Sequence, residues 1–182
     1  NNLEKKIIHK IVKPTLTALR SKKNPYTGFL YVGLMIRDNE PYLIEYNVRM
    51  GDPECQVIMP RLKTDLVKIL DASLKNKLSK VKIRWKNDKC MTTVLCAKGY
   101  PNKYKTNKII NLKKIKLNQK SFIYHAGTKL KDRSIISNGG RVLNITVLGN
   151  TFLEIRNKIL KIIKKINWKH GFYRSDIGWR VI

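Results

Sequence analysis

The sequence predicts an α+β protein in two parts, a helix with a strand hairpin and then a larger sheet packed by one helix. Apolar residues recur at helical spacing near both ends, over residues 3–21 and 152–166. Between these segments, short apolar runs alternate with turn residues, as expected for strands. The polar, basic stretch 75–80 separates the two parts, so we place the domain boundary between residues 78 and 79.

The first part, residues 1–78, begins with the helix 3–21, which we expect to be kinked or split near Pro14 because proline cannot donate the helical hydrogen bond. A strand is predicted from Phe29 to Ile36, followed by a turn at 38–40 and a second strand from Pro41 onward. A two-stranded hairpin with one helix is not independently stable. We therefore expect this part to need partners that the chain does not contain.

Two helices follow the hairpin in this part. The first is expected to begin with Asp52 as N-cap and Pro53 at the first helical position, and to end at Pro60. Thr64 and Asp65 cap the second, which is predicted to continue through Leu74.

The second part, residues 79–182, has the pattern of a mixed sheet covered by one helix. Strands are predicted over 81–85, 91–97, 121–126 and 141–148. The lysine-rich stretch 102–120 is predicted to be a loop with a short helix or strand near 109–117. The string Thr-Phe-Leu-Glu at 151–154 has the form of a capping box and starts the last long helix.

The charge balance is strongly basic, with 39 Lys and Arg against 12 Asp and Glu, a formal net charge of +27. Such a charge alone suggests a polyanion partner, but lysine is spread evenly among many Asn and Ile, which indicates compositional bias. The three cysteines form no disulfide framework, so a reducing cytoplasm is the expected location. No apolar run has the length of a membrane span. Because the chain starts with Asn1 and a helix already under way, we interpret it as a fragment.

Alternation along the strand that follows Pro41 predicts a core face of Ile44, Tyr46 and Val48. The opposite face is predicted to carry three polar side chains, Glu45, Asn47 and Arg49. Glu45 and Asn47 lie about 6.5 to 7 Å apart along a strand, so their oxygens can converge on one hard cation such as Mg²⁺. Arg49 adds a permanent cation suited to phosphate or carboxylate. From spacing alone, a solvated face of an edge hairpin is the slightly better interpretation.

Several strings, in order, resemble phosphoribosylamine-glycine ligase (glycinamide ribonucleotide synthetase), an ATP-grasp family of purine synthesis. The first segment carries Tyr-Thr-Gly-Phe-Leu-Tyr at 26–31, Ile-Glu-Tyr-Asn-Val-Arg at 44–49 and Gly-Asp-Pro-Glu at 51–54. The second part carries Gly-Tyr-Pro at 99–101, His-Ala-Gly-Thr at 125–128, Asn-Gly-Gly-Arg-Val-Leu at 138–143 and Arg-Ser-Asp-Ile-Gly-Trp-Arg at 174–180. The resemblance implies the second half of an ATP-grasp domain followed by the family's small C-terminal domain.

The resemblance also implies a reaction and roles for residues. The family joins glycine to 5-phosphoribosylamine with ATP, through a glycyl phosphate, and yields glycinamide ribonucleotide, ADP and phosphate. Glu45 and Asn47 match the family's ligands for Mg²⁺, with Mn²⁺ as a possible substitute, and Arg49 matches a catalytic phosphate contact. Asp52 and Glu54 would contact the amine substrate or glycine. The adenine pocket would lie in a missing N-terminal remainder, and we expect a monomer with no membrane or specific nucleic-acid partner.

Two alternatives stay open at this point. A basic nucleic-acid-binding module is supported by charge alone, and would need Lys and Arg gathered with exposed aromatic residues on one face. An inactive interaction fragment with the ligase fold is the other. The presence of Glu45, Asn47 and Arg49 argues against decay of the site.

Overall fold

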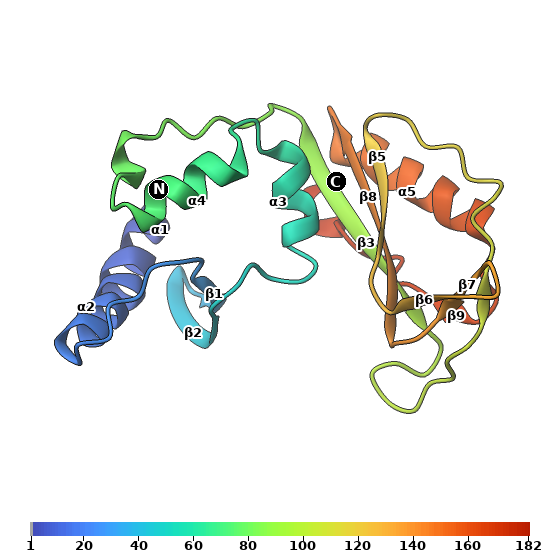
Figure 1. The fold of residues 1–182 in the computed structure, drawn as a ribbon, viewed down its shortest axis with the longest axis horizontal. Coiled ribbons are helices and arrows are strands. Elements are labelled where there is room, and N and C mark those ends of the chain that lie inside the picture. The colour runs from blue at the N-terminus through green and yellow to red at the C-terminus, as the bar shows by residue number, and fades with distance from the viewer. Residues whose placement is uncertain (1) are drawn as a thin grey trace. The chain divides into compact units, whose positions relative to one another are not determined.

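The computed structural model describes residues 2–182, which form two compact units. The first unit contains residues up to 52 together with 64–83, and the second contains 53–63 together with 84–182. The chain therefore passes from the first unit to the second, back to the first, and again to the second. The α+β class predicted from the sequence is confirmed, since each unit combines helices with antiparallel strands (Figure 1).

The first unit opens with one long helical segment that is split as predicted. It consists of α1 (Asn2–Ile7), a π-helical turn η1 (Ile8–Val12) and α2 (Lys13–Ser21). The amide of Lys13 donates to the carbonyl of Ile8, five residues back, and Pro14 follows at the start of α2. Proline has no amide hydrogen to continue the α-helical ladder, and the wider turn before it accommodates this break.

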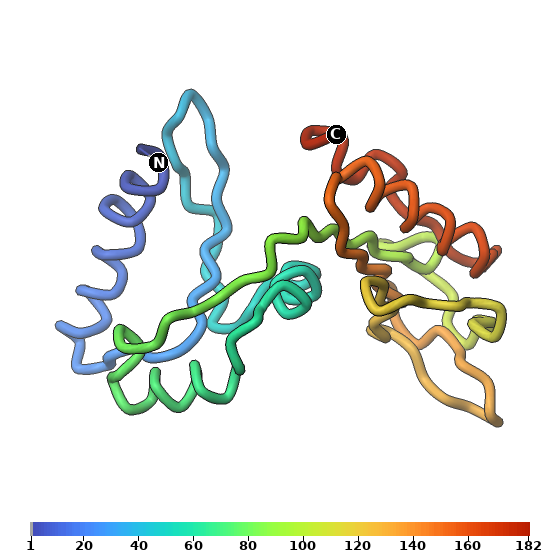
Figure 2. Tube along the Cα trace, turned by 90° about the horizontal axis from the view of Figure 1, so that it is seen from above, coloured from blue at the N-terminus to red at the C-terminus, as the bar shows by residue number. Residues whose placement is uncertain are grey.

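A two-stranded antiparallel hairpin follows, β1 (Tyr31–Arg37) and β2 (Glu40–Asn47). Figure 2 shows it beside the N-terminal helix, and α1 contacts β2. The turn places Asp38 and Asn39 at φ 51° and 61°, a left-handed conformation that Asp and Asn tolerate well.

The hairpin register contains one bulge, which changes the predicted faces. Gly33 pairs with Glu45 and Leu34 with Leu43, so Ile44 has no partner across the ladder. The predicted core face of Ile44, Tyr46 and Val48 is wrong for two reasons: the inserted residue interrupts the alternation at Ile44, and β2 ends at Asn47, before Val48. In the structure Ile44 is 63% and Val48 72% exposed, and only Tyr46 is partly buried.

The first unit ends with α4 (Leu66–Leu74) and a 3₁₀ turn, η2 (Leu78–Lys80). The predicted cap of α4 is confirmed, since the Asp65 side chain accepts from the amide of Lys68 at 3.1 Å.

The second unit begins with α3 (Cys55–Arg61), a short helix that packs against the sheet strands β3 and β8 described below. It starts two residues later than predicted, because Glu54 rather than Asp52 is the N-cap. Residues 52–54 form a turn, in which the carbonyl of Pro53 accepts from Gln56 at 3.2 Å. Pro60 lies inside the helix, which ends one residue beyond the predicted end.

Two antiparallel sheets make up most of this unit. The larger has the order β5-β8-β3-β9, and the smaller has the order β4-β7-β6. The strands are β3 (Lys89–Ala97), β4 (Ile109–Ile110), β5 (Ser121–His125), β6 (Thr128–Lys131), β7 (Ser134–Ser137), β8 (Arg141–Gly149) and β9 (Gly171–Phe172). Every recorded pairing is antiparallel, so the sheets are not mixed as we expected.

The core lies between the larger sheet and α5 (Phe152–Ile166). The capping box is confirmed, because the Thr151 hydroxyl accepts from the amide of Glu154 at 3.2 Å. The helix buries one face, formed by Ile155, Ile159, Ile162, Ile163 and Ile166. A 3₁₀ turn, η3 (Trp179–Val181), ends the chain.

One predicted strand is wrong. Residues 81–85 have strand composition, but only Trp85 makes a bridge, to Leu62. The predicted domain limits, 1–78 and 79–182, stay a prediction, because grouping by contacts does not define a family's domains. Within residues 2–182, no helix is long and apolar enough to cross a membrane.

Candidate functional site

Glu45 and Asn47 lie next to each other at the end of β2, beyond the bulge. The amide Nδ2 of Asn47 donates to Oε1 of Glu45 at 3.0 Å. Glu45 is exposed and Asn47 partly buried, so both side chains are accessible. The structure thus brings together the two residues that the sequence predicts as metal ligands.

The donor set fits a hard divalent cation that keeps other oxygen ligands. The pair offers one carboxylate and, when the Asn47 amide rotates, one carbonyl oxygen, within the reach of a single ion. Among residues 2–182, no group of three or more His, Cys, Asp or Glu side chains could hold a metal. Magnesium suits a two-ligand site of this kind, since it usually retains waters and binds substrate phosphates.

Tyr46 fixes the strand between these two ligands. Its hydroxyl lies 2.5 Å from Oγ1 of Thr15, and that hydroxyl in turn donates to the carbonyl of Ile11 at 2.8 Å. Because the single Thr15 proton goes to Ile11, the Tyr46 hydroxyl is the donor between the two side chains. The hydroxyl therefore joins β2 to the preceding helical segment.

Arg49 lies outside the strand, in a bend two residues past the end of β2. Its side chain is exposed, and Nη1 donates to the carbonyl of Met50 at 2.9 Å. The predicted face of three polar side chains is thus limited to Glu45 and Asn47, since alternation ends with the strand.

Asp52 and Glu54 are the first and last residues of the turn before α3. Asp52 is exposed, and Glu54 is partly buried at the N-cap position of α3, where its side chain makes no capping hydrogen bond. Its carbonyl instead accepts from the amides of Val57 and Ile58, both at 3.1 Å. The predicted substrate contacts of Asp52 and Glu54 stay predictions.

Sequence reasoning missed the residue that faces Glu45 across the hairpin, Gly33. A Cβ at Gly33 would lie 3.0 Å from Cγ of Glu45 and 3.6 Å from the ring of Tyr31. An isolated glycine inside a strand pattern is a signal of close approach, and could have pointed to this position.

Other polar candidates have local structural partners. The Nδ1 atom of His125 lies 3.0 Å from the hydroxyl of Thr128, and Arg174 binds Asp176 through two hydrogen bonds of 3.1 and 2.7 Å. Burial raises the pKa of the Cys90 thiol to about 11, where this residue lines a cavity of about 330 Å³ beneath α3.

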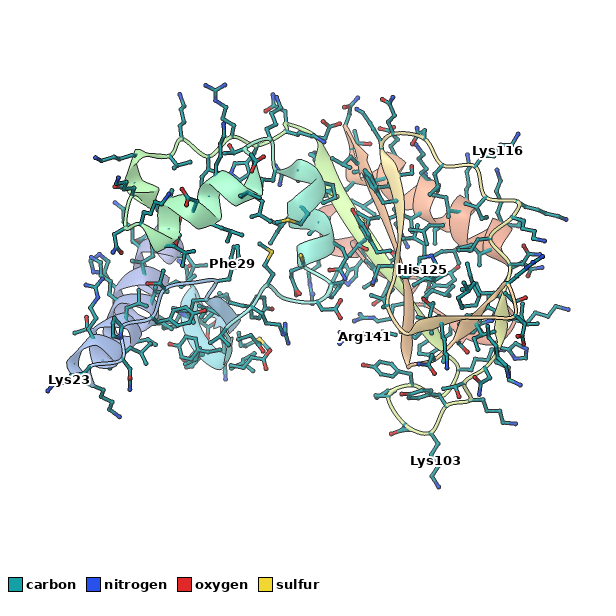
Figure 3. The ribbon with its side chains drawn as sticks, in the orientation of Figure 1. Lys23, Phe29, Lys103, Lys116, His125 and Arg141 are labelled. Atoms are coloured by element: carbon teal, nitrogen blue, oxygen red, sulfur yellow. The ribbon has the colours of Figure 1, made fainter. Side chains whose placement is uncertain are left out.

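Two basic side chains of the second unit, those of Lys103 and Lys116, lie far from a common face. Figure 3 shows Lys103 and Lys116 extending outward at opposite ends of this unit. This arrangement differs from the single basic face that a nucleic-acid-binding module would present.

Comparison with known proteins identifies two family segments along the chain. Residues 90–180 match the family model described as phosphoribosylglycinamide synthetase, C domain, and residues 1–55 match its ATP-grasp (A) domain. The first match covers half of the chain.

Individual relatives give the same result. The chain is 42% identical to phosphoribosylamine–glycine ligase of Brucella melitensis over 96% of its own length and 41% of that protein. It is 43% identical to the ligase of Agrobacterium fabrum, over 94% of the chain and 40% of that protein. The crystal structure of phosphoribosylamine–glycine ligase from Thermotoga maritima aligns with a TM-score of 0.77 at 34% identity, over 93% of this chain and 41% of that one.

The chain thus spans about two fifths of the length of the relatives that it matches. Its two matched segments occur in the order A domain and then C domain, and the Glu45–Asn47 pair lies in the first of them. The chain belongs to the phosphoribosylglycinamide synthetase family.

Proposed function

We propose that the protein carrying this chain is an ATP-dependent ligase that joins glycine to 5-phosphoribosylamine in purine synthesis. The products are glycinamide ribonucleotide, ADP and phosphate. The proposal is supported by one observation above all, the direct contact between Glu45 and Asn47 in a chain of this family. The relatives named for this reaction are longer, so the remaining N-terminal part of the polypeptide is the first partner that the activity needs.

In the proposed reaction, a carboxylate oxygen of glycine attacks the γ-phosphorus of ATP and ADP leaves. Glu45 and Asn47 hold a divalent cation, Mg²⁺ or in its place Mn²⁺, through their oxygen atoms. When bound, the ion neutralises phosphate charge and orients the transferred group. Arg49, two residues after Asn47, presents a guanidinium suited to two parallel hydrogen bonds with a phosphate or the acyl phosphate.

In the second step the amine nitrogen of phosphoribosylamine attacks the carbonyl carbon of glycyl phosphate. A new C–N bond forms, the bond between the carbonyl carbon and the phosphate oxygen breaks, and inorganic phosphate leaves with the former glycine oxygen. The attacking nitrogen gives up one proton to solvent as it becomes the amide nitrogen. We assign contacts to the amine substrate or glycine to Asp52 and Glu54. Both carboxylates can accept hydrogen bonds from the ammonium group of glycine or from the neutral amine of phosphoribosylamine.

The proposed domain division places the metal-binding half of the ATP-grasp domain at 1–78 and the C-terminal domain at 79–182. The adenine pocket and the cover over the phosphates are assigned to the N-terminal remainder. We propose a cytoplasmic location, as expected for a chain with three free cysteines, and a monomeric protein.

The test is ADP formation by the full-length protein with ATP, Mg²⁺, glycine and phosphoribosylamine. Turnover that requires both glycine and the amine is the expected result. With glycine labelled by ¹⁸O in both carboxylate oxygens, one labelled oxygen is expected in the released phosphate. Transfer of no label would refute the acyl phosphate step, and absence of turnover together with salt-sensitive nucleic-acid binding would favour the basic binding module instead.

A further inference from the structure

Gly33 occupies the position on β1 that faces the candidate metal ligand Glu45. Residues paired across an antiparallel hairpin project from the same face, so Gly33 and Tyr31 share a face with Glu45 and Asn47. A side chain at Gly33 would begin between the Glu45 side chain and the Tyr31 ring, 3.0 Å from one and 3.6 Å from the other.

We propose that Gly33 is a positioning residue for metal binding, because its missing side chain leaves Glu45 the space in which it meets Asn47. This inference rests on the proposed function, in which these two residues hold the cation. Gly33 itself touches neither substrate nor metal in this account.

A side chain at Gly33 would crowd Cγ of Glu45 and thereby displace the Glu45 carboxylate. The nearest atom is Cγ of Glu45, whose position depends on the backbone and on χ1 alone. A rotation about χ1 that relieves the contact also moves the carboxylate oxygens, which lie two bonds beyond Cγ. The 3.0 Å hydrogen bond to Asn47 would then be lost, and the two oxygens would no longer converge.

Backbone strain does not explain the glycine. Gly33 is absent from the glycines with positive φ, which are Gly28, Gly99 and Gly178. Its conformation is therefore one that other residues adopt, and a β-branched residue there would be favourable for a strand. A substitution at Gly33 should therefore keep or raise the stability of β1 while it displaces the side chain of Glu45.

The experiment measures the dissociation constant of Mn²⁺ by electron paramagnetic resonance in the full-length protein with a non-hydrolysable ATP analogue. The proteins compared are wild type, Gly33→Ala, Gly33→Val, Glu45→Ala and the double variant Gly33→Val/Glu45→Ala. We expect Gly33→Val to weaken Mn²⁺ binding about tenfold, the range seen when a group that orients a ligand is changed. Gly33→Ala should have a smaller effect in the same direction.

The double variant decides the cause. Once Glu45 lacks its Cγ, Gly33→Val should weaken Mn²⁺ binding no further, and an equal loss in both backgrounds would overturn the proposal. Met35→Val is the matched control, because Met35 is the next residue on the same face of β1 and is 58% exposed; its affinity should equal wild type. Thermal unfolding of each variant should occur at or above the wild-type temperature.

Two further outcomes separate this inference from the proposed function. If Glu45→Ala weakens Mn²⁺ binding but both Gly33 variants bind like wild type, the positioning role is overturned and the ligand assignment stands. If Glu45→Ala also binds Mn²⁺ like wild type, the ligand assignment fails and the positioning role fails with it. In that case ADP formation still tests the ligase activity independently.

Discussion

Replacing Tyr46 with Phe removes the hydroxyl that joins β2 to the helix before it. That hydroxyl donates to Oγ1 of Thr15 at 2.5 Å, and Thr15 keeps its own donation to Ile11 in the variant. No donor is left unsatisfied, so the expected cost is the net value of one hydrogen bond, about 1 kcal/mol. The strand that carries Glu45 and Asn47 should therefore open more often without losing its fold.

The assay is amide hydrogen exchange of β2 in the full-length protein, because exchange reports local opening that global unfolding would not resolve. A loss of about 1 kcal/mol corresponds to about fivefold faster exchange. Thr15→Val removes the same hydrogen bond from the other side and also the donation to Ile11, so its effect should be at least as large. The double variant should be no worse than Thr15→Val alone, because that change has already removed the hydrogen bond to Tyr46.

Two results would refute this reasoning. Effects of Tyr46→Phe and Thr15→Val that simply add would show that the two hydroxyls act independently. Unchanged exchange in β2 of both variants would show that the contact does not hold the strand. Amides of β8, in the other unit, serve as the internal control and should exchange at the wild-type rate in all three proteins.

Three further predictions concern chemistry and packing elsewhere. Burial raises the pKa of Cys90 to about 11, which leaves about a hundredfold less thiolate at pH 8 than a pKa of 9.0 would. Alkylation followed by mass spectrometry should therefore label Cys90 far more slowly in the native than in the unfolded protein, and equal rates would contradict this. Hydrogen bonds from Lys10 and then Lys6 lower the pKa of Glu40 to about 2, so the stability that this cluster contributes is present above about pH 4.5 and is lost as the pH falls towards 2. Carbon NMR titration of the Glu40 carboxyl should show a midpoint that rises in Lys10→Met, and an unchanged midpoint would count against the contact. Ile159→Ala, at a position 1% exposed in the core, should lower the free energy of unfolding of the second unit by about 3 kcal/mol in denaturant titration, and a loss under about 1 kcal/mol would mean that α5 packs otherwise.

The long helices were predictable because their signals are local. The period of 3.6 residues marks α5, and capping side chains within three residues of the start fix where α4 and α5 begin. The split near Pro14 follows from proline chemistry alone. None of these features depends on residues far away in the sequence.

The short strands were harder to predict. β6, β7 and β9 have two to four residues each, too few for an alternation to stand out. Residues 81–85 have the composition of a strand but no neighbouring strand along their length, so only Trp85 forms a bridge. Strand composition therefore predicts a strand only where pairing is also available.

The site was predictable in part for a similar reason. Period-two alternation places Glu45 beside Asn47, and the structure confirms that contact. The bulge at Ile44 and the end of β2 before Arg49 depend on pairing with β1, which the local pattern does not contain. Gly33 enters the site through the same pairing.

The magnesium dependence of ADP formation by full-length Asn47→Ala tests the metal-binding role of this residue directly. We expect turnover to fall by at least about tenfold, and more Mg²⁺ to be needed to reach half of the maximal rate. The far-ultraviolet circular dichroism should stay that of wild type, since Asn47 ends a strand and its side chain is only partly buried. A variant with the wild-type rate and the wild-type magnesium dependence would contradict the assignment of Glu45 and Asn47 as the metal-holding pair.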